Sequence, residues 1–290
     1  MRVDRSLAVL LVALGLAACA TPGPILTESV GTIRAGLGEV REQSALAFGN
    51  VNDTALQIDV ARVLQGPAPN LREEDFPLAI GEEERAKWSS AFDVLDDYLA
   101  ALQALVAPER AAATSTQLDG IANQLRGGNL GLQLPGAATA AFSTFAGALV
   151  QAKEERTATM IMRRVDPAFQ EVMAGMADAI GPDDRTGLRQ TVRLYWQGKF
   201  ADIRASYVAI TGNDAAATDR RRAVVGQFVK AMRDRDADLR DLAAMRTSML
   251  ALGAAHTAAA KGSSGDALFW IGRIGGWLDD IKTRTAAAKP

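Results

Sequence analysis

Residues 88–106, WSSAFDVLDDYLAALQALV, decide the fold class of this chain. Large apolar residues recur in this stretch at alternating steps of four and three, at Trp88, Phe92, Leu95, Leu99, Leu102 and Val106. That spacing puts them on one face of an α-helix, while Asp93, Asp96 and Asp97 point elsewhere. The stretch therefore predicts an amphipathic helix that buries one face against neighbouring helices.

The same spacing continues upstream and directly downstream. A stripe at residues 30–61 predicts a long helix, which we expect to kink or break at residues 49–53 because Gly and Asn have low helix propensity. Gly and Pro in residues 65–69 end it, and a loop follows to Gly81. After residue 106, Pro108 suits the first turn of a shorter helix that runs to about Leu125.

The second half of the chain repeats the pattern. Residues 142–152 lead a helix that meets Pro167, where we expect a kink or a restart because proline lacks an N–H and its ring crowds the preceding turn. Further stripes predict a helix over residues 188–210, a last long helix from about Ala215 to Ala260, and a final short one. No segment alternates with period two, which argues against strands.

These patterns predict an all-α protein. We expect residues 25–290 to form a bundle of about seven mostly antiparallel helices, long and with coiled-coil-like stripes. Any sub-domain boundary is expected in the glycine-rich stretch 126–136. The single cysteine allows no disulfide within the monomer, so packing must hold the fold.

Charge argues against one class of partner. The chain has 32 Lys and Arg against 34 Asp and Glu, a net charge of −2 at pH 7. It therefore offers no broad basic field for nucleic acid.

The amino-terminal residues have the pattern of an export signal. Arg2 and Arg5 precede an apolar stretch of 13 residues, Ser6 to Ala18, which is well short of the roughly 20 residues that a helix needs to cross a bilayer. It therefore predicts a cleaved signal peptide, residues 1–18.

The end of this segment, Leu16-Ala17-Ala18-Cys19, resembles the lipobox of bacterial lipoproteins. The resemblance covers residues 1–19 and implies cleavage before Cys19, a diacylglyceryl group on its sulfur and an acyl group on the new amino terminus. Two or three acyl chains hold a protein firmly on a membrane. The alternative is an ordinary secretory signal with a chance cysteine.

The lipobox has consequences for location. It implies a protein held on a bacterial cell membrane and facing the periplasm or the exterior, with residues 19–24 as a short lipidated tether. In an organism with two membranes, Ala20 after the cysteine implies the outer membrane, again by resemblance.

Chemical motifs are sparse. His256 is the only histidine and shares an apolar helix face with Met249 and Leu252. That position is typical of a packed, hydrogen-bonded histidine; as a general base it would need a nucleophile and an orienting acid from other helices. No second histidine or free cysteine is present for zinc, and the glycines lack a phosphate-loop motif. We assign no catalytic residue, no metal ligand and no cofactor beyond the lipid on Cys19.

Two segments are candidates for a partner surface. The first is a run of alternating charge that includes Arg233, Arg235 and Asp236, although such a run is more typical of an exposed, salt-bridged helix face. The second contains Trp270 and Trp277, among glycines that allow a close approach to another helix. Core packing by a terminal helix is the alternative for that segment.

Three functional classes follow. The leading hypothesis is a lipid-anchored, non-catalytic helical protein of the cell envelope, acting on a protein partner as scaffold, adaptor or accessory subunit. The second is a periplasmic binding protein for lipid or another hydrophobic ligand. Its apolar pocket would be lined by Phe142, Phe145, Met160, Met162, Met173 and Met176. The third is an enzyme that uses His256.

Overall fold

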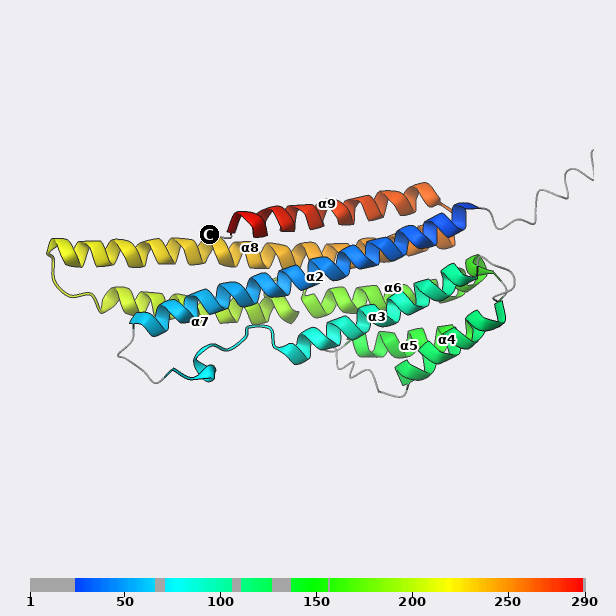
Figure 1. Cartoon of the computed structure of the whole chain (residues 1–290), viewed down its shortest axis with the longest axis horizontal. Coiled ribbons are helices and arrows are strands. Elements are labelled where there is room, and N and C mark those ends of the chain that lie inside the picture. Colours follow the sequence, from blue (N-terminus) through cyan, green and yellow to red (C-terminus); the bar gives the residue numbers. More distant parts are fainter. Residues whose placement is uncertain (1–23, 66–70, 106–110, 127–136, 156, 289–290) are drawn as a thin grey trace, which may run out of the picture.

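The structure, a computed structural model, describes residues 24–65, 71–105, 111–126, 137–155 and 157–288. These residues form eight α-helices and one short 3-10 turn, with no strand among them, so the predicted all-α bundle is confirmed (Figure 1). The elements are α2 (Pro24–Gln65), η2 (Glu73–Asp75), α3 (Glu82–Ala104), α4 (Ala111–Arg126), α5 (Ala137–Ala152), α6 (Ala158–Ile180), α7 (Gly187–Val208), α8 (Ala215–Ala260) and α9 (Ser264–Ala288). None of the helices in these ranges has both the length and the apolar character needed to cross a bilayer.

Helix α8 organises the bundle. Its 46 residues span about 69 Å at about 1.5 Å per residue, and it packs against α2, α6, α7 and α9. As Figure 1 shows, α6 and α7 follow one another along α8, while α5 packs on α6, α4 packs on α5, and α3 packs along α2. The start of α2 and the α8–α9 turn share one end of the molecule, and the α7–α8 turn forms the other end.

The stripe on α3 lies at the centre of the core. Trp88, Leu95, Leu99 and Leu102 are all buried. The ring of Phe48 on α2 packs edge-on against Trp88, with ring centroids 5.9 Å apart. Burial of each such side chain contributes about 1.5–3 kcal/mol, so the predicted apolar face of this helix is its main docking surface.

The sequence predicts a kink or a break of α2 at residues 49–53. The break is wrong, because the helix is continuous through these residues. Tertiary hydrogen bonds hold this segment. The Asn50 side chain donates to Thr285 Oγ1 at 2.9 Å, and the Asn52 side chain donates to the Ile80 carbonyl at 3.0 Å and accepts from the Ile80 N–H at 2.8 Å. These bonds offset the low helix propensity of asparagine.

The predicted restart at Pro167 is also misplaced. Pro167 lies inside α6, and the chain breaks earlier, between the end of α5 at Ala152 and the start of α6 at Ala158. Thr157 caps α6, because its side chain accepts a hydrogen bond from the Met160 N–H at 3.3 Å. A side-chain cap thus sets the boundary, and the proline is accommodated within the helix.

The last helix is longer than expected. The sequence suggests a short segment, whereas α9 has 25 residues and packs along both α2 and α8. Its buried stripe follows a four-three spacing, at Ala267, Ile271, Ile274, Leu278 and Ile281. A glycine of α2 makes a close approach to this stripe, because a Cβ on Gly36 would collide with Ile271.

Two predictions lie wholly or largely outside the described residues. Residues 1–23 contain the signal peptide, the lipobox and Cys19, and all but Arg126 of the stretch 126–136 is also outside. The helices that flank this stretch, α4 and α5, pack against each other.

Candidate functional site

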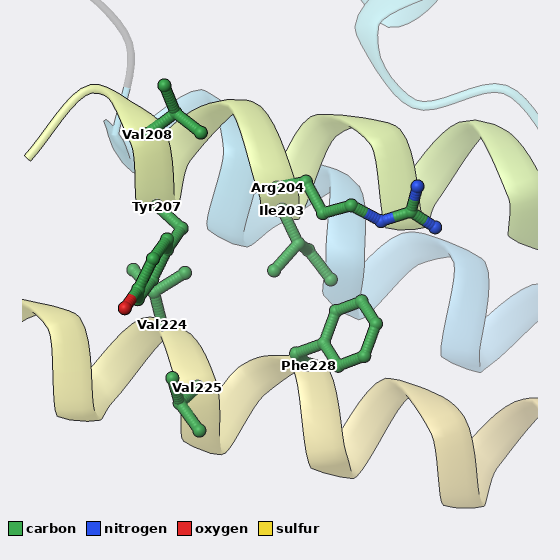
Figure 2. Close-up of a pocket in the computed structure, with 7 residues that line it drawn as sticks. All are labelled: Ile203, Arg204, Tyr207, Val208, Val224, Val225 and Phe228. Atoms are coloured by element: carbon green, nitrogen blue, oxygen red, sulfur yellow. The ribbon is translucent and has the colours of Figure 1, made fainter.

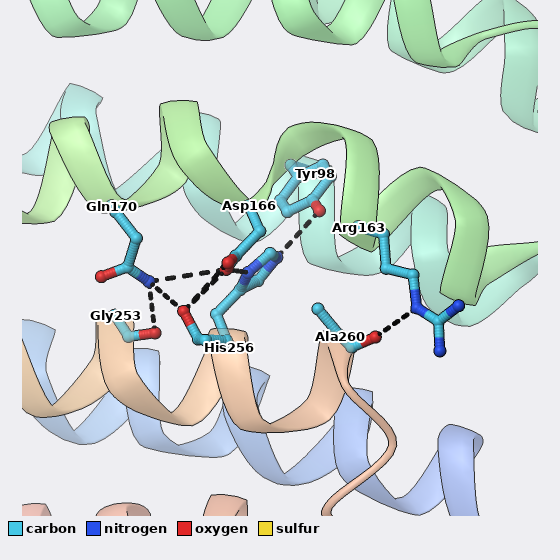
Figure 3. A network of polar contacts seen from close by, with 8 residues as sticks. Tyr98, Arg163, Asp166, Gln170, Gly253, His256 and Ala260 are labelled. Atoms are coloured by element: carbon cyan, nitrogen blue, oxygen red, sulfur yellow. Dashed lines mark hydrogen bonds and ion pairs between the residues drawn. The ribbon is translucent and has the colours of Figure 1, made fainter.

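The histidine lies in a polar network between α3, α6 and α8 (Figure 3). Its Nε2 atom is 3.0 Å from the Tyr98 hydroxyl oxygen, and its Nδ1 atom is 2.7 Å from Oδ1 of Asp166. Phe169 stacks on the imidazole, with ring centroids 4.2 Å apart. His256 is 0% exposed, as is Tyr98.

A second group of hydrogen bonds orients the carboxylate. The hydroxyl of Thr257 donates to Asp166, and the Gln170 amide donates to Thr257 Oγ1 at 2.8 Å and to the Gly253 carbonyl at 2.6 Å. A Cβ at position 253 would lie 2.8 Å from Gln170 Oε1, so a larger residue there would shift the Gln170 amide. The two polar groups that contact His256, the Tyr98 hydroxyl and the Asp166 carboxylate, are thus both hydrogen-bonded.

Protonation states follow from this geometry. Burial lowers the pKa of His256, and the hydrogen bond and charge of Asp166 oppose that effect only in part. Burial also acts to raise the pKa of Asp166, but hydrogen bonds from His256, Thr257 and Gln170 hold it below its usual value. The neutral imidazole therefore donates a hydrogen bond from Nδ1 to the carboxylate, and its Nε2 accepts a hydrogen bond from the Tyr98 hydroxyl.

The network has the residue types of a catalytic relay, but its histidine is not accessible to a substrate. A general base must reach the proton that it removes, directly or through one water. Both nitrogens of His256 are engaged and its ring is covered by Phe169. This geometry favours a structural role for His256, which ties α3 to α6 and α8.

A second polar cluster joins α2, α7, α8 and α9. Lys199 forms a buried ion pair with Asp59, and the Tyr195 hydroxyl donates to the same carboxylate at 3.3 Å. On α8, Asp238 accepts a hydrogen bond from Trp196 Nε1 at 3.0 Å. Next to it on α8, Asp241 pairs with Arg284 of α9 and accepts from Asn50 of α2 at 3.3 Å.

Asp238 is a buried carboxyl of this cluster whose pKa is raised. Burial raises its pKa to about 7; the Trp196 hydrogen bond acts against that rise, and the nearby Asp241 charge adds to it. A polar cavity of about 130 Å³ adjoins Asp238, where α9 ends beside α2 and α8. Within the described ranges, no group of three or more His, Cys, Asp or Glu side chains is arranged to hold a metal ion.

An apolar groove lies between α7 and α8 near their shared turn (Figure 2). We define it by its lining residues, Ile203, Arg204, Tyr207, Val208, Val224, Val225 and Phe228, which enclose about 330 Å³. Its lining surface is apolar.

Two arginines lie on the aromatic pair at the inner end of this groove. The rings of Phe200 and Phe228 are 5.2 Å apart between centroids. The guanidinium of Arg204 lies over Phe228 at 6.0 Å, and that of Arg235 lies over Phe200 at 5.3 Å. Arg235 also pairs with Asp236, at 2.7 Å.

The predicted partner residues do not form one surface. Arg233, Arg235 and Asp236 lie on α8 beyond the Asp241–Arg284 contact, whereas Trp270 and Trp277 lie on α9 on the other side of it. The two tryptophans are half-buried against the core, with Arg273 over both rings. Core packing, which was the alternative interpretation of this segment, thus accounts for the partial burial of the two tryptophans.

The predicted methionine pocket is part of the packed core. Five of its six expected lining residues are buried, namely Phe142, Phe145, Met162, Met173 and Met176. The sixth, Met160, is 49% exposed. The apolar cavity that the structure contains at the α7–α8 end lies elsewhere.

Sequence reasoning missed the buried carboxylates. Both interpretations of the charge run, a salt-bridged face and a partner surface, placed it at the surface, yet Asp238 and Asp241 are buried. A usable signal exists, because they precede Met245, Met249 and Leu252 at helical spacing on the same buried side. The groove was missed because its valines and Phe228 resemble ordinary core residues in the sequence.

Comparison with known proteins adds no relationship. No family model, curated protein or solved structure matches this chain.

Proposed function

We propose that this protein is a lipid-anchored, non-catalytic helical protein of the bacterial cell envelope that acts as a scaffold, adaptor or accessory subunit. Lipid on Cys19 holds one end of the bundle at the membrane surface. The α7–α8 end is held away from that surface, where it meets a protein partner.

The observation that carries this proposal is the placement of the two ends. Helix α2 begins at Pro24, five residues after the proposed lipidation site, and its start lies at the opposite end of the bundle from the α7–α8 turn (Figure 1). Helix α8 spans about 69 Å between these ends. A short tether on a long, stiff body fits a protein that bridges a distance from a membrane.

The surface supports the same orientation. Large apolar side chains are exposed near the α7–α8 end, among them Leu64 at 80% and Val208 at 79%. By contrast, His256 and Tyr98 are fully buried and hydrogen-bonded to each other, and His256 is also bonded to Asp166. Apolar groups left in solvent are typical of a surface that another molecule covers.

Cell fractionation of a Cys19→Ser variant tests the anchor. The variant is expected to lose lipid by mass spectrometry and to leave the membrane fraction, whereas Thr21→Ser keeps both properties. A Cys19→Ser protein that stays membrane-bound after an alkaline wash contradicts the proposed attachment.

Crosslinking in cells tests the working end. A photoreactive residue at Val208 is expected to trap one envelope protein reproducibly. The same residue at the exposed Gly38, on α2 near the anchored end, is the control and should not trap it. Identical products from both positions argue against a partner at the α7–α8 end.

A further inference from the structure

The groove between α7 and α8 has the character of a ligand site, and we propose that it binds a single-chain amphiphile, an aliphatic chain that carries an anionic head group. The chain lies against the valines, Ile203 and Phe228, and the head group pairs with Arg204. This site shares Val208 with the partner contact proposed above, and the test below does not depend on that contact.

Size and lining favour an aliphatic chain. The groove holds about 330 Å³, at the lower end of the roughly 300–1,000 Å³ typical of small-molecule sites. Its walls are aliphatic or aromatic, and Tyr207, Val208 and Val225 are all more than 40% exposed. A chain in the groove removes these walls from water, which is the driving force for apolar binding.

Charge favours an anionic head group. Among the residues that the structure describes, no carboxylate lies within ion-pair distance of Arg204, and its guanidinium lies over the ring of Phe228 at the groove wall. Arg235, over the adjoining ring of Phe200, is paired with Asp236, so Arg204 is the cation that the groove offers to a head group. A guanidinium binds a carboxylate or phosphate through paired hydrogen bonds, and such bonds strengthen beside an apolar wall.

Photolabelling tests the proposal on the lipidated protein in phosphatidylcholine nanodiscs. The probe is dodecanoate with a diazirine near the end of its chain, and labelled peptides are mapped by mass spectrometry. Labelling is expected within residues 203–208 and 224–228. Unlabelled dodecanoate should compete at least tenfold better than dodecanol, which lacks the charge.

Two matched pairs of variants localise the site. Val225→Trp fills the groove and should reduce labelling at least fivefold, whereas Val229→Trp, one turn along α8 and outside the lining, should leave it unchanged. Arg204→Gln should weaken dodecanoate competition about tenfold, and the exposed Arg220→Gln should not. Competition by a twelve-carbon lysophosphatidylglycerol, compared with dodecanoate, distinguishes a lysolipid from a free fatty acid as the source of the head group.

Several results overturn the proposal. They are labelling elsewhere, labelling that survives Val225→Trp, or competition that is equal for dodecanoate and dodecanol. A change of oligomeric mass in Val225→Trp without any labelling of the groove assigns this face to contact between copies of the chain instead.

Discussion

At the scale of single residues, burial shifts the pKa values of two side chains in opposite directions: it lowers that of His256 and raises that of Asp238. His256 is buried as a neutral group whose two nitrogens are both satisfied, and it joins three helices. Asp238 is buried among other carboxylates, with Trp196 Nε1 as its hydrogen-bond donor. The first arrangement stabilises the fold at neutral pH, whereas the second favours the protonated carboxyl.

The Tyr98 hydroxyl is expected to matter for stability because it is the partner of His256 Nε2. Tyr98→Phe leaves that buried nitrogen without a donor, which costs about 1–3 kcal/mol of unfolding free energy. Urea unfolding at pH 8 measures the difference. Tyr207→Phe is the control, since Tyr207 is 43% exposed, and it should change stability little. Equal effects of the two substitutions would count against a structural histidine network.

Asp238 predicts a distinct pH dependence. Its pKa is about 7 in the folded state, against an ordinary value of 3.8. Between pH 3.8 and pH 7 the folded protein therefore binds one proton more than the unfolded chain. The contribution to stability is therefore present below pH 4 and is lost as the pH rises through 7.

Asp238→Asn removes this titration while keeping an acceptor for Trp196 Nε1. Relative to the variant, the wild-type protein should lose on the order of 2 kcal/mol of stability between pH 5 and pH 7, at about 1.4 kcal/mol per pKa unit. Thermal or urea unfolding across this range gives the comparison. Parallel stability curves for the two proteins would show that Asp238 has an ordinary pKa.

At the scale of elements, the contact between α2 and α9 depends on a glycine that sequence inspection did not single out. The glycines of α9 were expected to permit close approach, yet a Cβ on Gly272 or Gly276 would meet nothing within 4 Å, and one on Gly275 would make only an ordinary contact, 3.4 Å from a carboxylate oxygen of Glu39 on α2. On α2, a Cβ at Gly36 would collide with the side chain of Ile271. The close approach is therefore set by α2.

Two alanine substitutions on α2 separate packing from helix propensity. Gly36→Ala is expected to destabilise by about 1–3 kcal/mol, because the branched Ile271 side chain has little freedom to move. Gly38→Ala is expected to stabilise by up to about 1 kcal/mol, because it lies in open space on the same helix. Denaturant midpoints at unchanged slope measure both. Stabilisation by both substitutions would show that α9 does not pack closely at Gly36.

At the scale of the whole molecule, the length of the bundle sets the geometry of the proposed anchor. The α8–α9 turn lies at the same end as the start of α2, and the α7–α8 turn lies at the other end (Figure 1). If lipid on Cys19 holds the first end at the bilayer, the other end stands tens of ångströms away.

Fluorophores on single thiols test this orientation in vesicles that contain quencher-bearing lipids. A label on Lys261→Cys, at the α8–α9 turn, is expected to be quenched, and one on Asn213→Cys, at the α7–α8 turn, is not. Lipidation of Cys19 leaves each variant with one reactive thiol. Quenching of both labels would show that the bundle lies flat on the membrane.

The all-α fold was predictable because helical spacing is local information. Trp88, Leu95 and Leu102 show their shared face without any knowledge of their neighbours, and the structure buries all three. The bounds of α8 were also predictable from local information. Asp214 caps the start of the helix by accepting a hydrogen bond from the Ala217 N–H at 2.6 Å. Local rules did not exclude a break at residues 49–53 or a restart at Pro167, neither of which occurs, because tertiary hydrogen bonds hold α2 and Thr157 caps α6 earlier.

The sequence by itself thus determined the helical class and most of the helical segments, because both depend on residues within a few turns of one another. Only the tertiary structure decided which polar groups are internal and which apolar groups remain at the surface. His256 meets Tyr98 and Asp166 across 158 and 90 residues, and the groove pairs α7 with the start of α8. Such contacts depend on the register and facing of separate helices, which helical periodicity alone does not encode.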